Sequence, residues 1–325
     1  MDVVTGVTPQ ARGTAGFWRR LFAFFLDGLL LGGVGACFGL VAYDDLVGLG
    51  DWGRALGFAI ALAYFGAMDS KLFGGQTLGK RIAGIKVVTA ADAPLTIGAS
   101  TLRAAIFLIP YFLNGAFIDA ALLTSWVSEL LTIAVFGVGL SIAYLLIFNR
   151  RTRQSLHDLA VGAYVVNRSA PPSGDGNRVW PVHFGVVGLI VIASAVLPLI
   201  TQKLANSSAF RPLLSVQQGL QQEPEVRHAT VNAGFNRFFS SGKGTTTKHF
   251  LDSKIFLSRR VTDFDSLANR SARVILERDP SANTQDVVSI SIIYGYDIGI
   301  ASAWRSRSFA FSPAEWRKRF TDPGN

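Results

Sequence analysis

A single charged residue, Asp27, interrupts an otherwise uncharged apolar run from Leu21 to Tyr43. The run is long enough to cross the roughly 30 Å hydrocarbon core of a bilayer as one helix. A carboxylate near the middle of such a helix costs about 2.5–3.5 kcal/mol, so it is expected to face a partner, a cavity or an ion pathway. Arg20 lies seven residues earlier and therefore on the same helical stripe, about 10 Å away along the axis. The chain is thus predicted to be a membrane protein with buried polar groups.

The overall composition agrees with this prediction. The 325 residues are 50% hydrophobic and only 16% charged, which is too apolar for an average soluble protein. The net charge of +9 suits anionic lipid surfaces and the positive-inside rule, and we expect no nucleic-acid partner. The single cysteine, Cys37, allows no internal disulfide and is interpreted as a small core residue. No cleavable signal peptide is expected at the N-terminus.

Four further apolar runs follow the first, at about 55–68, 104–123, 130–148 and 179–200, and the run at 55–68 is the shortest. Thirteen Lys and Arg residues flank one side of the five runs, whereas only Arg54 flanks the other. By the positive-inside rule, the N-terminus is predicted to lie in the cytoplasm. Five crossings then place the residues after about 201 outside the inner membrane.

The expected fold is a mainly α membrane bundle of five spanning helices with a C-terminal extracytoplasmic α+β domain. The predicted parts are a cytoplasmic tail (1–16), a four-span membrane domain (17–168), a linker with the fifth span (169–204) and the outer domain (205–325). Two Val-rich pieces in the cytoplasmic loops, 85–89 and 163–167, could pair as strands beneath the membrane.

The outer domain has alternating and capping patterns of its own. Alternating apolar residues from Val288 to Tyr296 predict a half-buried strand, followed by a second strand near 300–311. Ser312, Pro313 and Glu315 form a helix start, so 313–320 should be helical. A helix at 263–277 and a strand at 226–232 are also expected. The 17 Lys and Arg against 11 Asp and Glu after residue 200 either attract anionic headgroups or an acidic partner, or form a dispersed solvated surface.

Three motifs stand out in the first half of the chain: AGFWRRLFAFFLDGLLL (15–31), GQTLGKRIAGIKVV (75–88) and RRTRQSLHDLAVGAYVV (150–166). Together they resemble the RDD family of integral membrane proteins. Carried over to this sequence, the arginine that the family is named for is Arg20, and the two aspartates are Asp27 and Asp158. The resemblance implies transport or ion exchange. It says nothing about the fifth run or the roughly 120 residues beyond it.

We expect a polar cluster at the cytoplasmic side of the bundle. Arg103, at the start of the third run, and Asp69, at the end of the second, should lie at a similar depth. The candidate cluster comprises Arg20, Asp27, Asp158, Arg103 and Asp69. One interpretation is a carboxylate that binds a cation or a proton during transport. The other is a fixed ion pair or hydrogen-bonded anchor that sets the register of the helices.

Four glycines lie on one face of the first helix, about 100° from Asp27. They are Gly28, Gly32, Gly35 and Gly39. Because glycines allow close approach, this face is predicted to pack, within the chain rather than in a dimer.

The loop FGGQTLGKR satisfies part of a phosphate-binding motif, but Arg81 stands where Ser or Thr should hold magnesium, so nucleotide binding is not expected. Instead, Lys80 and Arg81 are expected at lipid phosphates. The residues of this loop motif are Gly75, Gln76, Gly79, Lys80 and Arg81.

Ser155, His157 and Asp158 lie too close in sequence to form a catalytic triad. They predict a short interfacial helix, in which Asp158 pairs with Arg20 or Arg153. His157 either titrates near neutral pH or is a plain hydrogen-bonded histidine. The four histidines show no metal-ligand spacing.

Two functions follow. The first is ion or small-solute transport through the polar cluster, which would require a homo-oligomer because five helices are few for alternating access. The second is a non-transporting anchor or envelope assembly protein that presents its outer domain to a partner. Neither function is enzymatic, and no cofactor or metal is expected. The expected partners are the lipid bilayer, anionic headgroups and an envelope protein.

Overall fold

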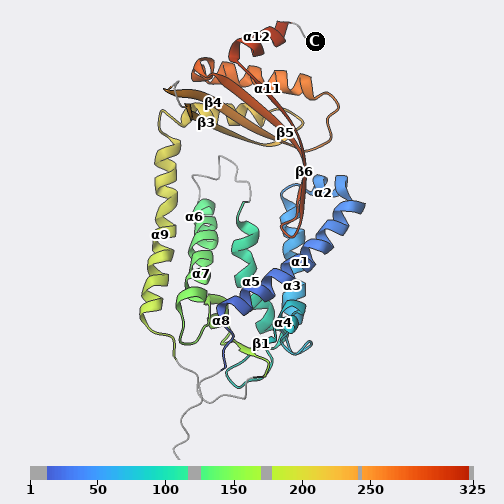
Figure 1. Ribbon diagram of the computed structural model, residues 1–325, viewed down its shortest axis with the longest axis vertical. Coiled ribbons are helices and arrows are strands. Elements are labelled where there is room, and N and C mark those ends of the chain that lie inside the picture. The colour runs from blue at the N-terminus through green and yellow to red at the C-terminus, as the bar shows by residue number, and fades with distance from the viewer. Residues whose placement is uncertain (1–12, 116–125, 170–177, 241–243, 322–325) are drawn as a thin grey trace, which may run out of the picture.

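The computed structural model describes residues 13–115, 126–169, 178–240 and 244–321. A helical N-terminal region and a C-terminal β-sheet domain are stacked along the long axis of the molecule (Figure 1). Most of the predicted N-terminal tail and the predicted linker after Ser169 lie outside the described residues.

Three helices in the described part of the chain are long and apolar enough to cross a membrane. They are α1 (Phe17–Val41), the continuous α6–α7 helix (Trp126–Phe148, with a π-helical stretch at Ile133–Val138) and α9 (Val182–Ala205). A fourth candidate is the pair α2 (Tyr43–Leu49) and α3 (Trp52–Met68), which is bent by 105°. α5 (Ile97–Leu113) is apolar but shorter. By length and composition alone, the described helices give three spans, or four if the bent pair is one span, and the predicted five are not confirmed.

α5 begins earlier than the apolar run that predicted it. The side chain of Thr96 accepts a hydrogen bond from the backbone N–H of Ala99 and caps the helix, so the helix starts at Ile97 rather than near 104. α5 ends at Leu113, and the rest of the run, from 116, lies outside the described residues.

A small sheet closes the end of the molecule opposite the C-terminal domain. β1 (Ile85–Val88) pairs antiparallel with β2 (Tyr164–Asn167), which confirms the predicted pairing of the two Val-rich pieces. The inward side chains of both strands form a buried cluster with Ala15 and Ala23 of the first helix region. Two short helices, α4 (Leu78–Ile82) and α8 (Leu156–Ala160), precede the two strands at the base of the bundle.

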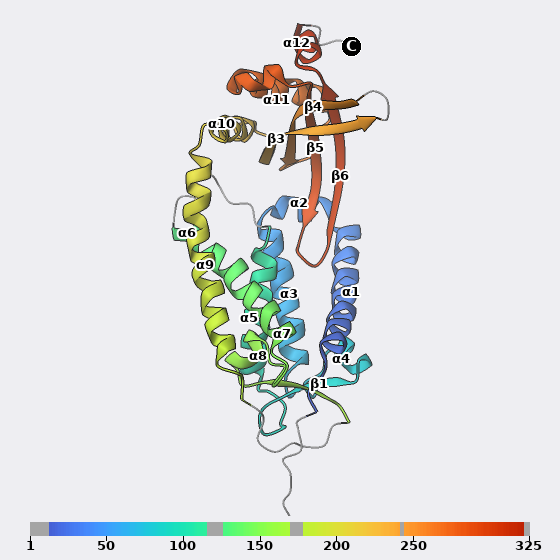
Figure 2. The same cartoon turned by 60° about the vertical axis from the view of Figure 1, so that its left-hand side comes forward.

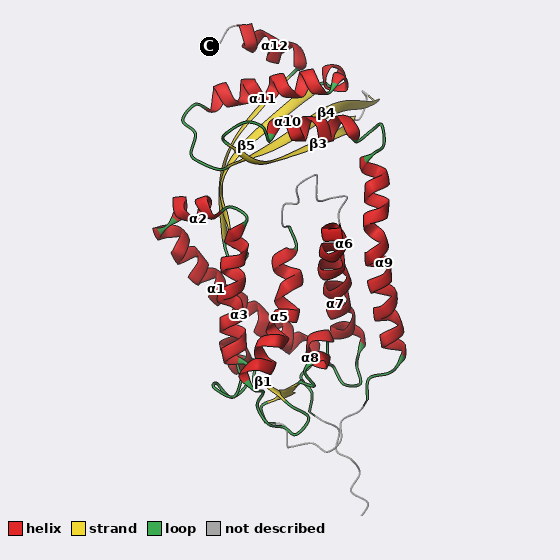
Figure 3. Ribbon diagram, turned by 180° about the vertical axis from the view of Figure 1, so that it is seen from behind, coloured by secondary structure: helices red, strands yellow, loops and turns green. Residues whose placement is uncertain are grey.

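The C-terminal domain is a four-stranded sheet in the order β3-β4-β5-β6, with β4 and β5 parallel and the other neighbours antiparallel. Its elements are α10 (Arg211–Leu220), β3 (Val226–Ser240), β4 (Gly244–Leu257), α11 (Phe264–Arg278), a 3₁₀ turn (Pro280–Thr284), β5 (Val287–Asp297), β6 (Ser302–Phe311) and α12 (Pro313–Thr321). α10 and α11 cover the face that points away from the membrane helices, and the domain core lies between them and the sheet (Figure 3).

The strand at 288–296, the strand that ends at Phe311 and the two predicted helices are confirmed in this domain. Ser312 and Glu315 make the predicted cap: the backbone N–H of Ser312 donates to the Glu315 carboxylate at 2.8 Å. β4 and α10 were not predicted, because the first half of β4 is polar and exposed and α10 is short.

The β5–β6 hairpin leaves the sheet and reaches down between α1 and α3 (Figure 2). The tip of the hairpin packs against glycines of α1 and α3. A Cβ on Gly35 of α1 would lie 2.7 Å from the Cβ of Ala301, and a Cβ on Gly57 of α3 would collide with the carbonyl oxygen of Ile298. The glycine face of α1 therefore packs within the chain, although its partner is a hairpin rather than a helix.

The four predicted glycines differ in what they meet. Gly39 lies against the ring of Tyr296, and Gly32 lies near the carbonyl of Ile300, whereas the Cβ position of Gly28 is open. Non-helical backbone at membrane depth is tolerated only where protein buries it, and these close contacts bury the hairpin tip.

Candidate functional site

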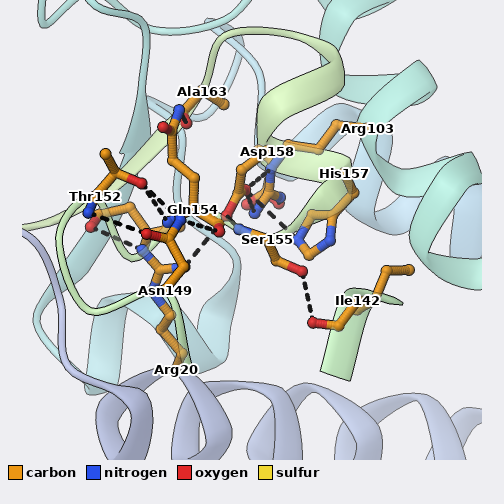
Figure 4. Close-up of polar contacts among 12 residues, drawn as sticks. Arg20, Arg103, Ile142, Asn149, Thr152, Gln154, Ser155, His157, Asp158 and Ala163 are labelled. Carbon is orange, nitrogen blue, oxygen red and sulfur yellow. Dashed lines mark hydrogen bonds and ion pairs between the residues drawn. The ribbon is translucent and has the colours of Figure 1, made fainter. Parts of the chain in front are cut away.

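Asp158 is the centre of a buried group of charges at the base of the bundle (Figure 4). It lies in the first turn of α8 and accepts a hydrogen bond from the backbone N–H of Ser155, which makes a capping box. Arg103 of α5 donates to one carboxylate oxygen from Nε at 2.8 Å and from Nη2 at 2.7 Å. Arg20 of α1 contacts the other oxygen at 3.2 Å. Of the two predicted partners, Arg20 and Arg153, the structure places Arg20 in contact.

The charges continue from Arg103 into a chain. Nη1 of Arg103 contacts Asp69 at 2.9 Å, and Nζ of Lys80 contacts both oxygens of Asp69 at 2.6 Å. The resulting ion-pair chain, Arg20–Asp158–Arg103–Asp69–Lys80, joins α1, α8, α5, the end of α3 and α4. Its side chains are 0–12% exposed. Helices and loops far apart in sequence are therefore tied together at one level.

Asp27 does not belong to this chain of ion pairs, which corrects the expected cluster. Its carboxylate accepts hydrogen bonds from the hydroxyls of Tyr64 at 2.7 Å and Thr77 at 2.6 Å, and from the backbone N–H of Gly79 at 2.8 Å. It is 1% exposed. Because two of these three donors come from the start of α4, Asp27 holds α4 against α1.

Gly79 is required for this contact. A Cβ there would collide with the backbone oxygen of Ala23 and lie 2.9 Å from the Asp27 carboxylate. Together, the ion-pair chain and Asp27 contain three carboxylates and three cations. The buried group is therefore balanced in charge, which is the condition under which charges are tolerated away from water.

The loop motif folds inward rather than toward lipid. Lys80 is buried against Asp69, which corrects its expected place at lipid phosphates, whereas Arg81 is exposed. Gln76 donates to the carbonyl of Ile85 at 2.8 Å, and Gly75 has a positive φ of 73° and receives the backbone N–H of Val87. The motif thus docks the loop onto β1.

Burial and neighbouring charges set the protonation states of the groups outside the helices that span the membrane. Burial alone would raise the pKa of Asp158, but the charges of Arg103 and Arg20 outweigh it and hold the pKa well below its usual range. Burial lowers the pKa of Lys80, and the charge of Asp69 opposes this shift. Burial lowers the pKa of His157 to about 3. His157 is therefore neutral at physiological pH, which excludes the interpretation that it titrates there.

Several supporting residues carried no sequence signal. Asn149 donates to Thr152 at 2.7 Å and to the carbonyl of Gln154 at 2.9 Å, and Gln154 donates to Ala163 at 2.8 Å (Figure 4). These bonds shape the turn that precedes α8. Tyr64 and Thr77 were missed for the same reason, because no sequence pattern shows that a neutral donor lies beside a buried carboxylate.

In this arrangement, the carboxylates are bound by donors of the chain itself. Each carboxylate of the group is held by at least two donors, and within the described part of the chain no cluster of His, Cys, Asp and Glu could hold a metal ion. Two nitrogens of the group, Nε of Arg20 and Nδ1 of His157, are buried without a hydrogen-bond partner among the described residues.

A comparison with protein families matched residues 14–162, just under half of the chain, to the model of the RDD family, a family of membrane proteins. The matched region contains Asp27 and the whole ion-pair chain, and it ends before α9. Comparisons with curated proteins and with solved structures found no match.

Proposed function

We propose, from the match of residues 14–162 to the RDD family of membrane proteins, that the protein is a membrane anchor that holds its C-terminal domain in a fixed position for an envelope partner. The observation that carries the proposal is the β5–β6 hairpin seated among the helices. A domain that only followed a spanning helix would need no such seat, because a linker tolerates relative motion.

Polar contacts reinforce the seat. Arg54 of α3 pairs with Asp297 of the hairpin at 2.5 Å and donates to the carbonyl of Phe112, at the end of α5, at 2.8 Å. The hydroxyl of Tyr111 donates to the carbonyl of Gly299 at 3.0 Å. One hairpin thus contacts α1, α3 and α5 together, which fixes both the position and the rotation of the domain.

The proposal includes five crossings, a cytoplasmic N-terminus and an extracytoplasmic C-terminal domain. The distribution of basic residues supports this orientation. α3 and α5 serve as short spans: the 17 residues of α5 are about 25 Å long, slightly less than the hydrocarbon core. α3 and α5 pack against each other, and each keeps exposed apolar side chains, such as Leu56 and Leu102, that can face lipid.

Transport of an ion or small solute is the second candidate. It is favoured by the concentration of buried ionisable groups at one end of the bundle, since such groups in membrane proteins mark ion pathways. A homo-oligomer would supply the additional helices of a transport path. Against it, every carboxylate of the group is already bound by donors of the chain itself.

Flux measurements separate the two candidates. The full chain is reconstituted in proteoliposomes, and the flux of Na⁺, K⁺ and protons is compared for the parent, Asp27→Asn and Asp265→Asn, an exposed carboxylate of the C-terminal domain. We expect all three to match empty liposomes. A flux in the parent that Asp27→Asn abolishes and Asp265→Asn preserves would overturn the anchor proposal in favour of transport.

A further inference from the structure

A cavity of about 570 Å³ lies where the C-terminal domain meets the helices. α3 and α5 form one side, and the face of the sheet that points toward the helices forms the other. Most of its wall is apolar and aromatic. The large side chains there are Trp52, Phe58, Ile109, Phe112, Phe256 and Trp304. Its volume falls within the roughly 300–1,000 Å³ of small-molecule sites.

The few charged groups at the cavity differ in whether they are paired. Arg54 is bound by Asp297, and Nε2 of His228 lies 2.8 Å from Asp51. Arg227 donates to the carbonyl of Val47 at 2.7 Å, and no carboxylate among the described residues pairs with it. A guanidinium has five N–H donors, so Arg227 retains donors and a full positive charge at the cavity. The site therefore offers an apolar space with one guanidinium, that of Arg227, which no described carboxylate pairs with.

The cavity lies at the end of the helices nearest the C-terminal domain. It borders the first turn of α3 and the last turn of α5, on the side where α9 ends and the C-terminal domain begins (Figures 1 and 3). Trp52 and Trp126, at the same ends of their helices, are 77% and 69% exposed. Exposed tryptophans at helix ends are typical of the headgroup region of a bilayer.

We infer that this cavity binds one anionic phospholipid of the adjacent leaflet. One of its acyl chains lies against the aromatic wall, and its phosphate lies at Arg227. An apolar space at headgroup depth is reached from the bilayer, where acyl chains are abundant, and a guanidinium binds a phosphate through two parallel hydrogen bonds. The inference is independent of whether the protein transports an ion.

Binding is tested on the purified full chain, delipidated in detergent and titrated with phosphatidylglycerol, followed by native mass spectrometry. Phosphatidylcholine tests the charge of the headgroup, and glycerol 3-phosphate tests a free phosphate without acyl chains. Ala55→Trp fills the cavity from an exposed position of α3. Arg227→Gln removes the cation, and Arg259→Gln, 65% exposed elsewhere in the domain, is the matched control.

We expect the parent to bind one phosphatidylglycerol, at least tenfold more tightly than Ala55→Trp does. The preference for phosphatidylglycerol over phosphatidylcholine should be at least fivefold weaker in Arg227→Gln than in the parent. Arg259→Gln should match the parent. Equal binding by the parent and a folded Ala55→Trp would overturn the inference. So would full competition by glycerol 3-phosphate, or equal losses in the two arginine variants.

A second measurement does not depend on the filled variant. Trp304 faces the cavity, so phosphatidylglycerol brominated on its acyl chains should quench the part of the tryptophan fluorescence that Trp304→Phe removes. If this component is quenched no more by brominated phosphatidylglycerol than by the unbrominated lipid, the acyl chain does not enter the cavity and the inference is wrong.

Discussion

Replacing Asp158 by Asn should destabilise the helical region more than any conservative change at its surface. Asp158 is fully buried and binds Arg103 through two nitrogens and Arg20 through one. After the change, Arg103 keeps Asp69, but Arg20 loses its carboxylate partner and keeps only the carbonyl of Val165. Removing one partner of a buried ion pair costs about 3–5 kcal/mol. At the lower limit, the unfolding equilibrium shifts roughly 150-fold.

The measurement is unfolding by SDS in mixed micelles, followed by circular dichroism at a helix wavelength. Asp265→Asn is the control, because Asp265 and Arg307 are exposed and Arg319 is partly exposed, so these surface pairs are worth at most about 1 kcal/mol. A double-mutant cycle of Asp158→Asn with Arg103→Gln should show a coupling of about 1–3 kcal/mol. If Asp158→Asn unfolds within 1 kcal/mol of the parent, the ion-pair chain does not hold the helices together and the argument fails.

Three further changes test other parts of the structure. Because His157 is neutral in the fold with a pKa of about 3 but has an ordinary value of 6.5, the unfolded state gains a proton first as the pH falls, so stability is full above pH 6.5 and decreases toward pH 3. Between pH 7 and pH 5, His157 should cost the parent about 2 kcal/mol of stability, and His157→Gln should not show this loss. An unchanged pH profile in the variant would refute this. Gly79→Ala should cost about 1–3 kcal/mol by forcing α4 from α1, whereas Gly98→Ala, with open space, should cost nothing; equal melting temperatures would contradict the contact. Gly57→Ala should undock the hairpin and broaden the spin-label distances between α1 and α11, whereas Gly33→Ala should keep them narrow; two narrow distributions would show that the seat needs no glycine.

The sequence predicted the part of the site that consists of charged residues in apolar segments. An arginine and an aspartate in apolar surroundings must find partners, so Arg20, Asp158, Arg103 and Asp69 could be expected at one depth. The partners of Asp27 could not, because neutral hydroxyls and backbone N–H groups stabilise a carboxylate without any compositional sign. Lys80 was placed at lipid for a related reason: a basic loop beside a membrane usually faces headgroups, and only the fold shows Asp69 within reach.

The fold was predictable where the periodicity of apolar residues was strong. It was not predictable where contacts between distant segments determine the packing. Alternation revealed β5, and a capping box revealed α12. The hairpin seat depends on glycines of two helices that meet residues more than 200 positions away, such as Gly57 and Ile298. The sequence showed that α1 had a face for close packing, but it did not show what would fill it.

The two ends of the bundle bear on the choice between anchor and transporter. α1, α3 and α5 are joined by the ion-pair chain at one end and by the β5–β6 hairpin at the other. Alternating access would require these helices to separate at each end in turn. Unpairing one buried charge costs about 3–5 kcal/mol, so an open state would be populated at roughly 0.6% or less unless a bound ligand stabilised it by a similar amount. The ligand groups available for that are carboxylates already bound within the chain. Contacts that suit a rigid anchor therefore oppose transport, and a measured flux would require at least one of these two ends to open.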